Sequence, residues 1–208
     1  MNKSEQMIMA IERDLLFGRD HFEGFIPHGE VDYEARILRN IKYMKRGPLE
    51  EDPSHKQPIG YALIVNPGRR MVFAYKRAEQ DESYAEKRLQ GKWSWGIGGH
   101  IEEDKEGTGG NPIHNSLLRE VSEEVRMDGQ ITNITKLGYI NREVGVHQVH
   151  FGILYLIETD STEVKPEDSE IAQGGLMGLG QLEEILYSKD CVVEEWSLIA
   201  FSQLKRQL

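Results

Sequence analysis

The residues best suited to chemistry are three glutamates in the stretch Leu118-Arg119-Glu120-Val121-Ser122-Glu123-Glu124-Val125. In a helix, Glu120, Glu123 and Glu124 would stand at positions i, i+3 and i+4, so their side chains would converge on one face. Carboxylates placed together repel one another unless a cation lies between them. Hard divalent cations such as Mg²⁺ take oxygen ligands. The spacing therefore predicts a metal site on this face.

An amphipathic helix is expected to carry these glutamates. Leu117, Val121 and Val125 recur at the helical period on a side that is turned away from the carboxylates, so one side of the helix would pack on a core. Asn111 followed by Pro112 is typical of a helix N-cap and first turn. The pattern predicts a helix from about residue 112 to about residue 126.

A glycine-rich loop precedes this helix. Residues 93–99 read Trp-Ser-Trp-Gly-Ile-Gly-Gly, which indicates an aromatic strand that runs into a turn with accessible backbone. Such a turn, facing the glutamates, could supply a backbone carbonyl to a metal ion. The loop and the helix together predict a metal-dependent phosphate site.

The two segments carry a recognisable motif. Gly-Gly-His-Ile-Glu at 98–102, a spacer, and Arg-Glu-Val-Ser-Glu-Glu at 119–124 resemble the signature of Nudix hydrolases. The resemblance implies a Nudix-like α/β/α sandwich with a mixed sheet over roughly residues 57–204. It also implies Mg²⁺-dependent hydrolysis, with Mn²⁺ as an alternative ion, of a diphosphate linkage in a nucleoside diphosphate derivative or related phosphoanhydride.

The resemblance also implies roles for single residues. Glu123 and Glu124 would be metal ligands, and Glu120 would be a ligand or the base that deprotonates water. Gly98 would offer its carbonyl oxygen, and Arg119 would orient the glutamates. Nudix-like folds often bring one further acidic ligand from a later segment, for which we select Glu170 in the polar stretch 159–175.

The sequence departs from the family pattern in three places. About six residues are inserted within 104–110, and Asn111 occupies the position of the first motif glutamate unless Glu106 serves through a loop that folds back. Arg126 stands where the pattern ends in glycine. These departures motivate a second hypothesis, a catalytically inactive Nudix-like module that binds a nucleotide or a sugar phosphate.

Two groups of residues could contact a substrate, and each has two interpretations. Lys76 and Arg77 at a predicted strand end are either solvated charges or a phosphate clamp, because arginine matches phosphate oxygens with a bidentate fork. Trp93 and Trp95 either pack in the core or offer a ring, with Trp95 preferred, to stack a nucleobase. His28 and His55 are expected to be surface residues.

Composition restricts the class of protein. The chain has 208 residues and a formal charge of −10, which argues against general nucleic-acid binding. It contains one cysteine, Cys191, and has no apolar run of membrane-spanning length, so we expect a cytoplasmic protein that does not bind membranes.

Hydrophobic periodicity predicts two parts. Helices over 3–16 and 31–43 would form an extension, residues 1–56, that serves a homodimer contact or a lid, and residues 57–208 would form the hydrolase domain. The remaining expected elements are strands at 61–65, 71–75, 92–97, 132–141 and 146–158 and helices at 181–187 and 193–204.

Overall fold

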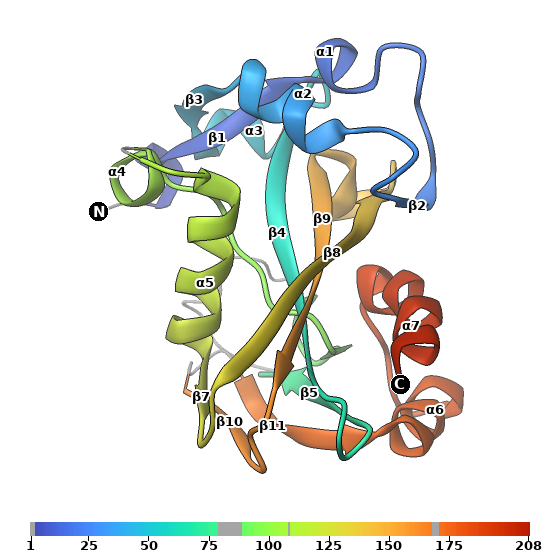
Figure 1. The fold of residues 1–208 in the computed structure, drawn as a ribbon. Helices are drawn as coiled ribbons and strands as arrows, with labels where there is room; N and C mark the ends of the chain where they lie inside the picture. The colour runs from blue at the N-terminus through green and yellow to red at the C-terminus, as the bar shows by residue number, and fades with distance from the viewer. Residues whose placement is uncertain (1–2, 79–88, 108, 168–170) are drawn as a thin grey trace. The chain divides into compact units, whose positions relative to one another are not determined.

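The structure is a computed structural model that describes residues 3–78, 89–107, 109–167 and 171–208 (Figure 1). The chain forms two compact units. The first comprises Met1–Tyr61, Gly98–Arg119 and Lys136–Leu154, and the second comprises Ala62–Ile97, Glu120–Thr135 and Tyr155–Leu208. Strands β4, β8 and β9 and helix α5 contribute residues to both.

The first unit contains short helices and strands from the N-terminal third of the chain. In chain order its elements are η1 (Lys3–Glu5), β1 (Met7–Glu12), α1 (Arg13–Phe17), β2 (Gly24–Pro27), α2 (Tyr33–Arg39), β3 (Lys42–Lys45), α3 (Arg46–Leu49), α4 (Glu103–Glu106) and η3 (Gly145–Gln148). Strands β4 (His55–Asn66), β8 (Ile131–Asn141) and β9 (His150–Thr159) begin or end in this unit.

The predicted helix over 3–16 is wrong in its central part. Met7–Glu12 forms strand β1, which pairs antiparallel with β3 and, at Ile11, with Lys56 of β4. The physical reason is burial on both faces: Ile8 through Ile11 are all buried, and a short continuous apolar run suits a covered strand as well as a helix. The helix expected over 31–43 is shorter and begins at Tyr33, with Asp32 capping the amide of Ala35 at 3.0 Å. The boundary at residue 57 stays a prediction.

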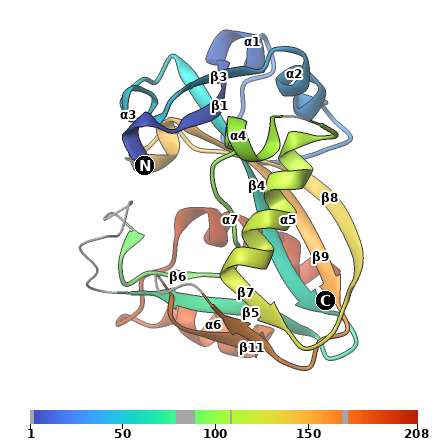
Figure 2. The same ribbon diagram turned by 90° about the vertical axis from the view of Figure 1, so that its left-hand side faces the viewer.

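The sheet confirms the predicted mixed α/β class. Its strands are hydrogen-bonded in the order β11-β5-β4-β9-β8-β2. β4 and β5 (Met71–Arg77) are antiparallel, as expected for a hairpin, whereas β4 and β9 lie side by side and run in the same direction (Figures 1 and 2). The sheet is therefore mixed.

An aromatic cluster forms part of the core of the first unit. The Tyr33 and Tyr139 rings meet edge to face with centroids 5.1 Å apart, and the Tyr139 and Phe151 rings stack at 5.8 Å. Phe17 packs against Phe151 at 5.9 Å. These contacts join α1, α2, β8 and β9.

The second unit contains the C-terminal helices. Its elements are β5, β6 (Trp93–Ser94), β7 (Val125–Met127), β10 (Val164–Pro166), β11 (Ile171–Gly178), α6 (Leu179–Tyr187) and α7 (Glu195–Gln207). Helices α6 and α7 lie beside each other (Figure 1), and an ion pair joins Lys205 to Glu183. The strand expected at 92–97 is reduced to β6, and the polar stretch 159–175 contributes β10 and the start of β11.

Candidate functional site

Helix α5 (Pro112–Glu124) carries the three glutamates, and its start is as predicted. Asn111 caps it, since its side-chain oxygen accepts from the amides of Ile113 at 3.0 Å and His114 at 3.3 Å. Ile113, Leu117 and Val121 are buried at successive turns. The helix is therefore seated along an apolar stripe, which makes it a firm support for charged residues.

The ion pair of the motif is formed by Glu106. Its carboxylate is 4% exposed and pairs with the Arg119 side chain, while its other oxygen accepts from the amide of Glu102 at 2.7 Å. The Arg119 Nη2 also donates to the carbonyl of His100 at 3.0 Å. Arg119 is thus anchored to the glycine loop and to α4.

Strand β1 explains why the loop folds back. The amide of Met9 donates to the carbonyl of Ile101 at 2.8 Å, and Ile8 forms an antiparallel bridge with Glu102. These contacts fix the end of the glycine loop just before α4 begins. The four-residue helix then places the buried carboxylate of Glu106 beside Arg119.

Gly98 lies at a point of close backbone approach. A Cβ atom at this position would stand 2.6 Å from the carbonyl oxygen of Gly60 and 2.9 Å from Cγ2 of Ile59, so only glycine fits. The requirement for glycine is therefore steric. Its role as a carbonyl ligand stays a prediction.

The helix exit explains the missing terminal glycine. Helix α5 ends at Glu124 and the chain passes directly into β7, where Arg126 pairs with Lys165 of β10. The carbonyl of Glu124 accepts from the amide of Glu167 at 2.8 Å. Extended backbone accommodates any side chain, so arginine replaces glycine here without strain.

The proposed ligands on α5 differ in exposure. Glu123 is exposed, whereas Glu120 and Glu124 are half-buried. Glu170 lies outside the described residues. The ligand roles stay predictions, because they come from motif position.

The predicted substrate contacts have structural partners. Arg77 forms an ion pair with the buried Glu194, and Lys76 lies in β5 opposite Trp93 of β6. Trp95 is fully buried: its indole N–H donates to the carbonyl of Ser197 at 2.6 Å and its ring packs on Phe201. These contacts agree with core packing, the alternative interpretation of Trp95.

Sequence reasoning missed a cluster of donors in the first unit. Glu50, His100 and His150 each bring one ligand-type atom to within 4.8 Å of the other two. These residues stand about fifty positions apart along the chain, so no local spacing could reveal them. His28 is exposed, as expected, and His55 pairs with Asp52 at 2.8 Å.

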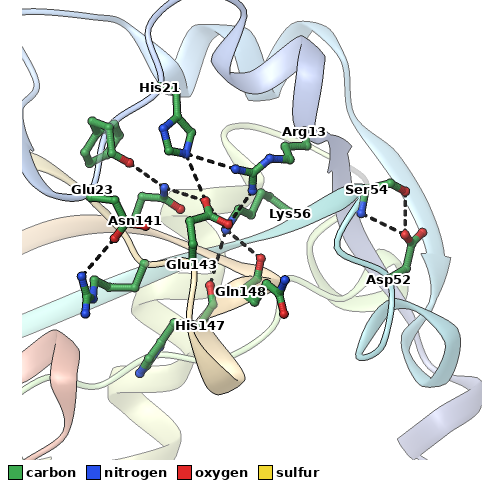
Figure 3. A network of polar contacts seen from close by, with 12 residues as sticks. Arg13, His21, Glu23, Asp52, Ser54, Lys56, Asn141, Glu143, His147 and Gln148 are labelled. Atoms are coloured by element: carbon green, nitrogen blue, oxygen red, sulfur yellow. Dashed lines mark hydrogen bonds and ion pairs between the residues drawn. The ribbon is translucent and has the colours of Figure 1, made fainter.

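A second polar network of the first unit surrounds Lys56, which is fully buried (Figure 3). Its ammonium lies 3.2 Å from Glu143 and donates to the carbonyl of Gln148 at 2.8 Å. Burial lowers the pKa of Lys56 to about 8, against the opposing attraction of Glu143. Burial alone would raise the pKa of Glu143, but hydrogen bonds from Arg13 and Asn141 and the charge of Lys56 lower it to about 2.

Comparison with known proteins decides the family. No family model matches the chain. The chain is 31% identical over 206 residues to Protein YmaB of Bacillus subtilis (strain 168), which covers 95% of this chain and 96% of that protein. It is 25% identical to Tm1382, a candidate Nudix hydrolase, and the two structures superpose with a TM-score of 0.77 over 98% of this chain and 100% of Tm1382. The chain belongs to the Nudix family.

More distant Nudix structures share the fold. The Nudix domain of Shewanella oneidensis NrtR, solved with ADP-ribose, is 12% identical and has a TM-score of 0.55 over 73% of this chain and 88% of that domain. Among the described residues, no helix is both long enough and apolar enough to span a bilayer.

Proposed function

We propose that this Nudix protein is a Mg²⁺-dependent pyrophosphohydrolase that cleaves a diphosphate linkage in a nucleoside diphosphate derivative or related phosphoanhydride. The ion pair between Glu106 and Arg119 carries the proposal. The inserted residues and Asn111 suggest a degraded motif and motivate the alternative of an inactive binding module. With Glu106 in the motif position, the catalytic helix keeps its anchor, which supports turnover.

The chemistry follows from charge. Glu120, Glu123 and Glu124 would hold Mg²⁺, which neutralises phosphate oxygens and lowers the pKa of a bound water. Carboxylate oxygens are the donors that this ion prefers, and the three glutamates stand at helical positions i, i+3 and i+4, so the residues fit the metal. Arg119, held by Glu106 and the carbonyl of His100, would fix the helix turn from which Glu120 projects.

The substrate class sets the first experiment. Purified protein with Mg²⁺ or Mn²⁺ should release phosphate or a nucleoside monophosphate from at least one member of a panel of dinucleotide polyphosphates, nucleotide sugars and oxidised nucleotides. ADP-ribose belongs in this panel, because the NrtR Nudix domain was solved with it. Nucleotide binding without turnover of any member would support the inactive module instead.

Glu123→Gln tests the metal role, because it keeps the shape of the side chain and removes its charge. We expect turnover to fall at least roughly a hundredfold, the scale on which groups that stabilise transition-state charge act. Glu184→Gln, an exposed position on α6, is the matched control and should keep full activity. Unchanged turnover in Glu123→Gln would reject the ligand role.

Glu106→Gln tests the anchor. The substitution weakens the hold on Arg119, and we expect a loss of activity of about 10- to 100-fold, as is typical for residues that orient ligands. Restoring activity with higher Mg²⁺ would identify a positioning effect on the metal site. Glu103→Gln, three residues earlier in α4 and exposed, is the control. Equal activity of the two variants would contradict the role of Glu106 in holding Arg119.

The homodimer contact stays a prediction.

A further inference from the structure

The donor cluster of the first unit brings together three separate segments. Glu50 directly follows α3, His100 belongs to the glycine loop, and His150 is the first residue of β9. The two Nε2 atoms of the histidines lie 3.3 Å apart, and the Nε2 of His100 lies 3.8 Å from Oε1 of Glu50. All three residues belong to one compact unit, so the cluster is a property of that unit alone.

The tautomer of His150 is fixed by its partner. Its Nδ1 lies 2.6 Å from the carbonyl oxygen of Val146. A carbonyl can only accept, so Nδ1 carries the proton and Nε2 presents a lone pair toward His100. A second ring nitrogen held in this way is the usual arrangement for a metal-binding histidine.

The ring of His100 faces a buried amide. Its Nε2 lies 2.7 Å from Oε1 of Gln57, a residue that is 1% exposed. The amide nitrogen of Gln57 has no hydrogen-bond partner among the described residues. A buried amide is thus directed at the cluster while its nitrogen has no partner in the described part of the chain, an arrangement that is unfavourable in an apolar interior.

Glu50 completes the set and supplies negative charge. Its Oε1 accepts from Nε of Arg46 at 3.0 Å, which orients the carboxylate. Its Oε2 is buried and has no partner among the described residues. One oxygen is therefore held in place while the other remains available to a cation.

We propose that Glu50, His100 and His150 form a binding site for a divalent transition-metal ion, with Zn²⁺ as its best representative. Two imidazoles and one carboxylate suit zinc and its neighbours, whereas Mg²⁺ prefers oxygen ligands. The site uses none of the glutamates of α5. Gln57 either supplies a fourth ligand through its oxygen or orients His100.

The role that the geometry supports is structural. An ion bound here would join α3, the glycine loop and β9. The main-chain carbonyl of His100 accepts from Arg119, so the same residue would connect the ion to the anchor of the catalytic helix. The ion would therefore stabilise the unit that holds the motif arginine.

Direct titration tests the site. Untagged full-length protein, stripped with a chelator, should bind one Zn²⁺ per chain by calorimetry in the presence of millimolar Mg²⁺. Glu50→Gln should weaken this binding at least tenfold, whereas the matched control Glu51→Gln, at the next and exposed position, should leave it unchanged. Glu123→Gln should also leave zinc binding unchanged, which separates this site from the proposed catalytic ions.

Cobalt gives a second readout that needs no variant. Co²⁺ bound by imidazole nitrogens in the wild-type protein should give visible ligand-field bands that Zn²⁺ abolishes at one equivalent. If Glu50→Gln does not fold, His150→Gln with His28→Gln as its control replaces it. Absence of stoichiometric binding, equal affinity in Glu50→Gln and Glu51→Gln, or a Co²⁺ spectrum with oxygen ligands only would overturn the proposal.

Discussion

The first unit contains two buried polar clusters that differ in how their charges are matched. Around Glu143, Arg13 donates to one carboxylate oxygen at 2.6 Å, while Lys56 and Asn141 lie 3.2 and 2.9 Å from the other (Figure 3). Around His100, two ring nitrogens face each other, and Glu50 and Gln57 each keep an atom without a partner in the described part of the chain. The carboxylate charge of the first cluster is matched by cationic partners, although the Oδ1 of Asn141 also has no partner among the described residues, whereas the second cluster offers nitrogen and oxygen donors that suit a cation.

The way in which charges are matched distinguishes a polar network that only stabilises the fold from a cluster that can bind a ligand. A buried ion pair with every charge matched is strongly destabilising to break, because the remaining charge is left without compensation. A cluster of metal-ligating atoms stabilises the folded chain when it binds an ion, because binding favours the folded state. Removing one carboxylate from each cluster should therefore give opposite patterns.

Glu143→Gln should have the largest effect on stability. It leaves the ammonium of Lys56 buried without its counter-charge, so we expect the free energy of unfolding to fall by about 3–5 kcal/mol. Urea denaturation at neutral pH measures this loss. The exposed Glu30→Gln is the control and should change stability by less than about 0.5 kcal/mol. A loss below about 1 kcal/mol in Glu143→Gln would show that the network is not matched as described.

The same pair predicts a pH dependence. The pKa of Glu143 is about 2 in the folded chain, below its ordinary value of 4.5, so the unfolded chain binds more protons between these two values. The contribution of Glu143 is therefore complete above pH 4.5 and is lost as the pH falls toward 2. Denaturation midpoints of the wild type and Glu143→Gln should converge over this window. A constant difference down to pH 2 would contradict the lowered pKa.

The second cluster should respond to metal and hardly to mutation. In metal-free buffer, Glu50→Gln should change the free energy of unfolding by less than about 1 kcal/mol, since its partly exposed pair with Arg46 is worth little. Free Zn²⁺ at a hundred times its dissociation constant should stabilise the wild type by about 2.7 kcal/mol. Thermal denaturation with and without Zn²⁺ checks both. Equal stabilisation of the wild type and Glu50→Gln would remove the contrast between the clusters.

The parts of the fold that were predicted correctly depend on local sequence. Asn111 and Pro112 predicted the start of α5, and the two apolar runs at 61–65 and 71–75, on either side of the turn at residues 66–69, predicted the paired strands β4 and β5. Strand β1 was mistaken for a helix because a short apolar run has no decisive period, and its partners β3 and β4 come later in the chain.

The candidate site could be predicted only where its residues are close in sequence. The spacing of Arg119, Glu120, Glu123 and Glu124 identified the helix and the family. The partner of Arg119 could not be chosen between Asn111 and Glu106, because the choice depends on β1 holding Ile101 and thereby turning α4 inward. The Glu50, His100 and His150 cluster depends entirely on tertiary packing.

The smallest effect is expected at the edge of the matched network. Glu23 pairs with Arg142 at 3.0 Å, and both side chains are substantially exposed. Water screens such a pair and holding two long side chains together costs entropy, so Glu23→Gln should lower the free energy of unfolding by no more than about 0.5–1 kcal/mol. Urea denaturation of Glu23→Gln, Glu143→Gln and the double variant measures this loss and its coupling to the centre. Additive losses would place Glu23 outside the network, whereas a coupling energy above about 0.5 kcal/mol would extend the matched network to the surface.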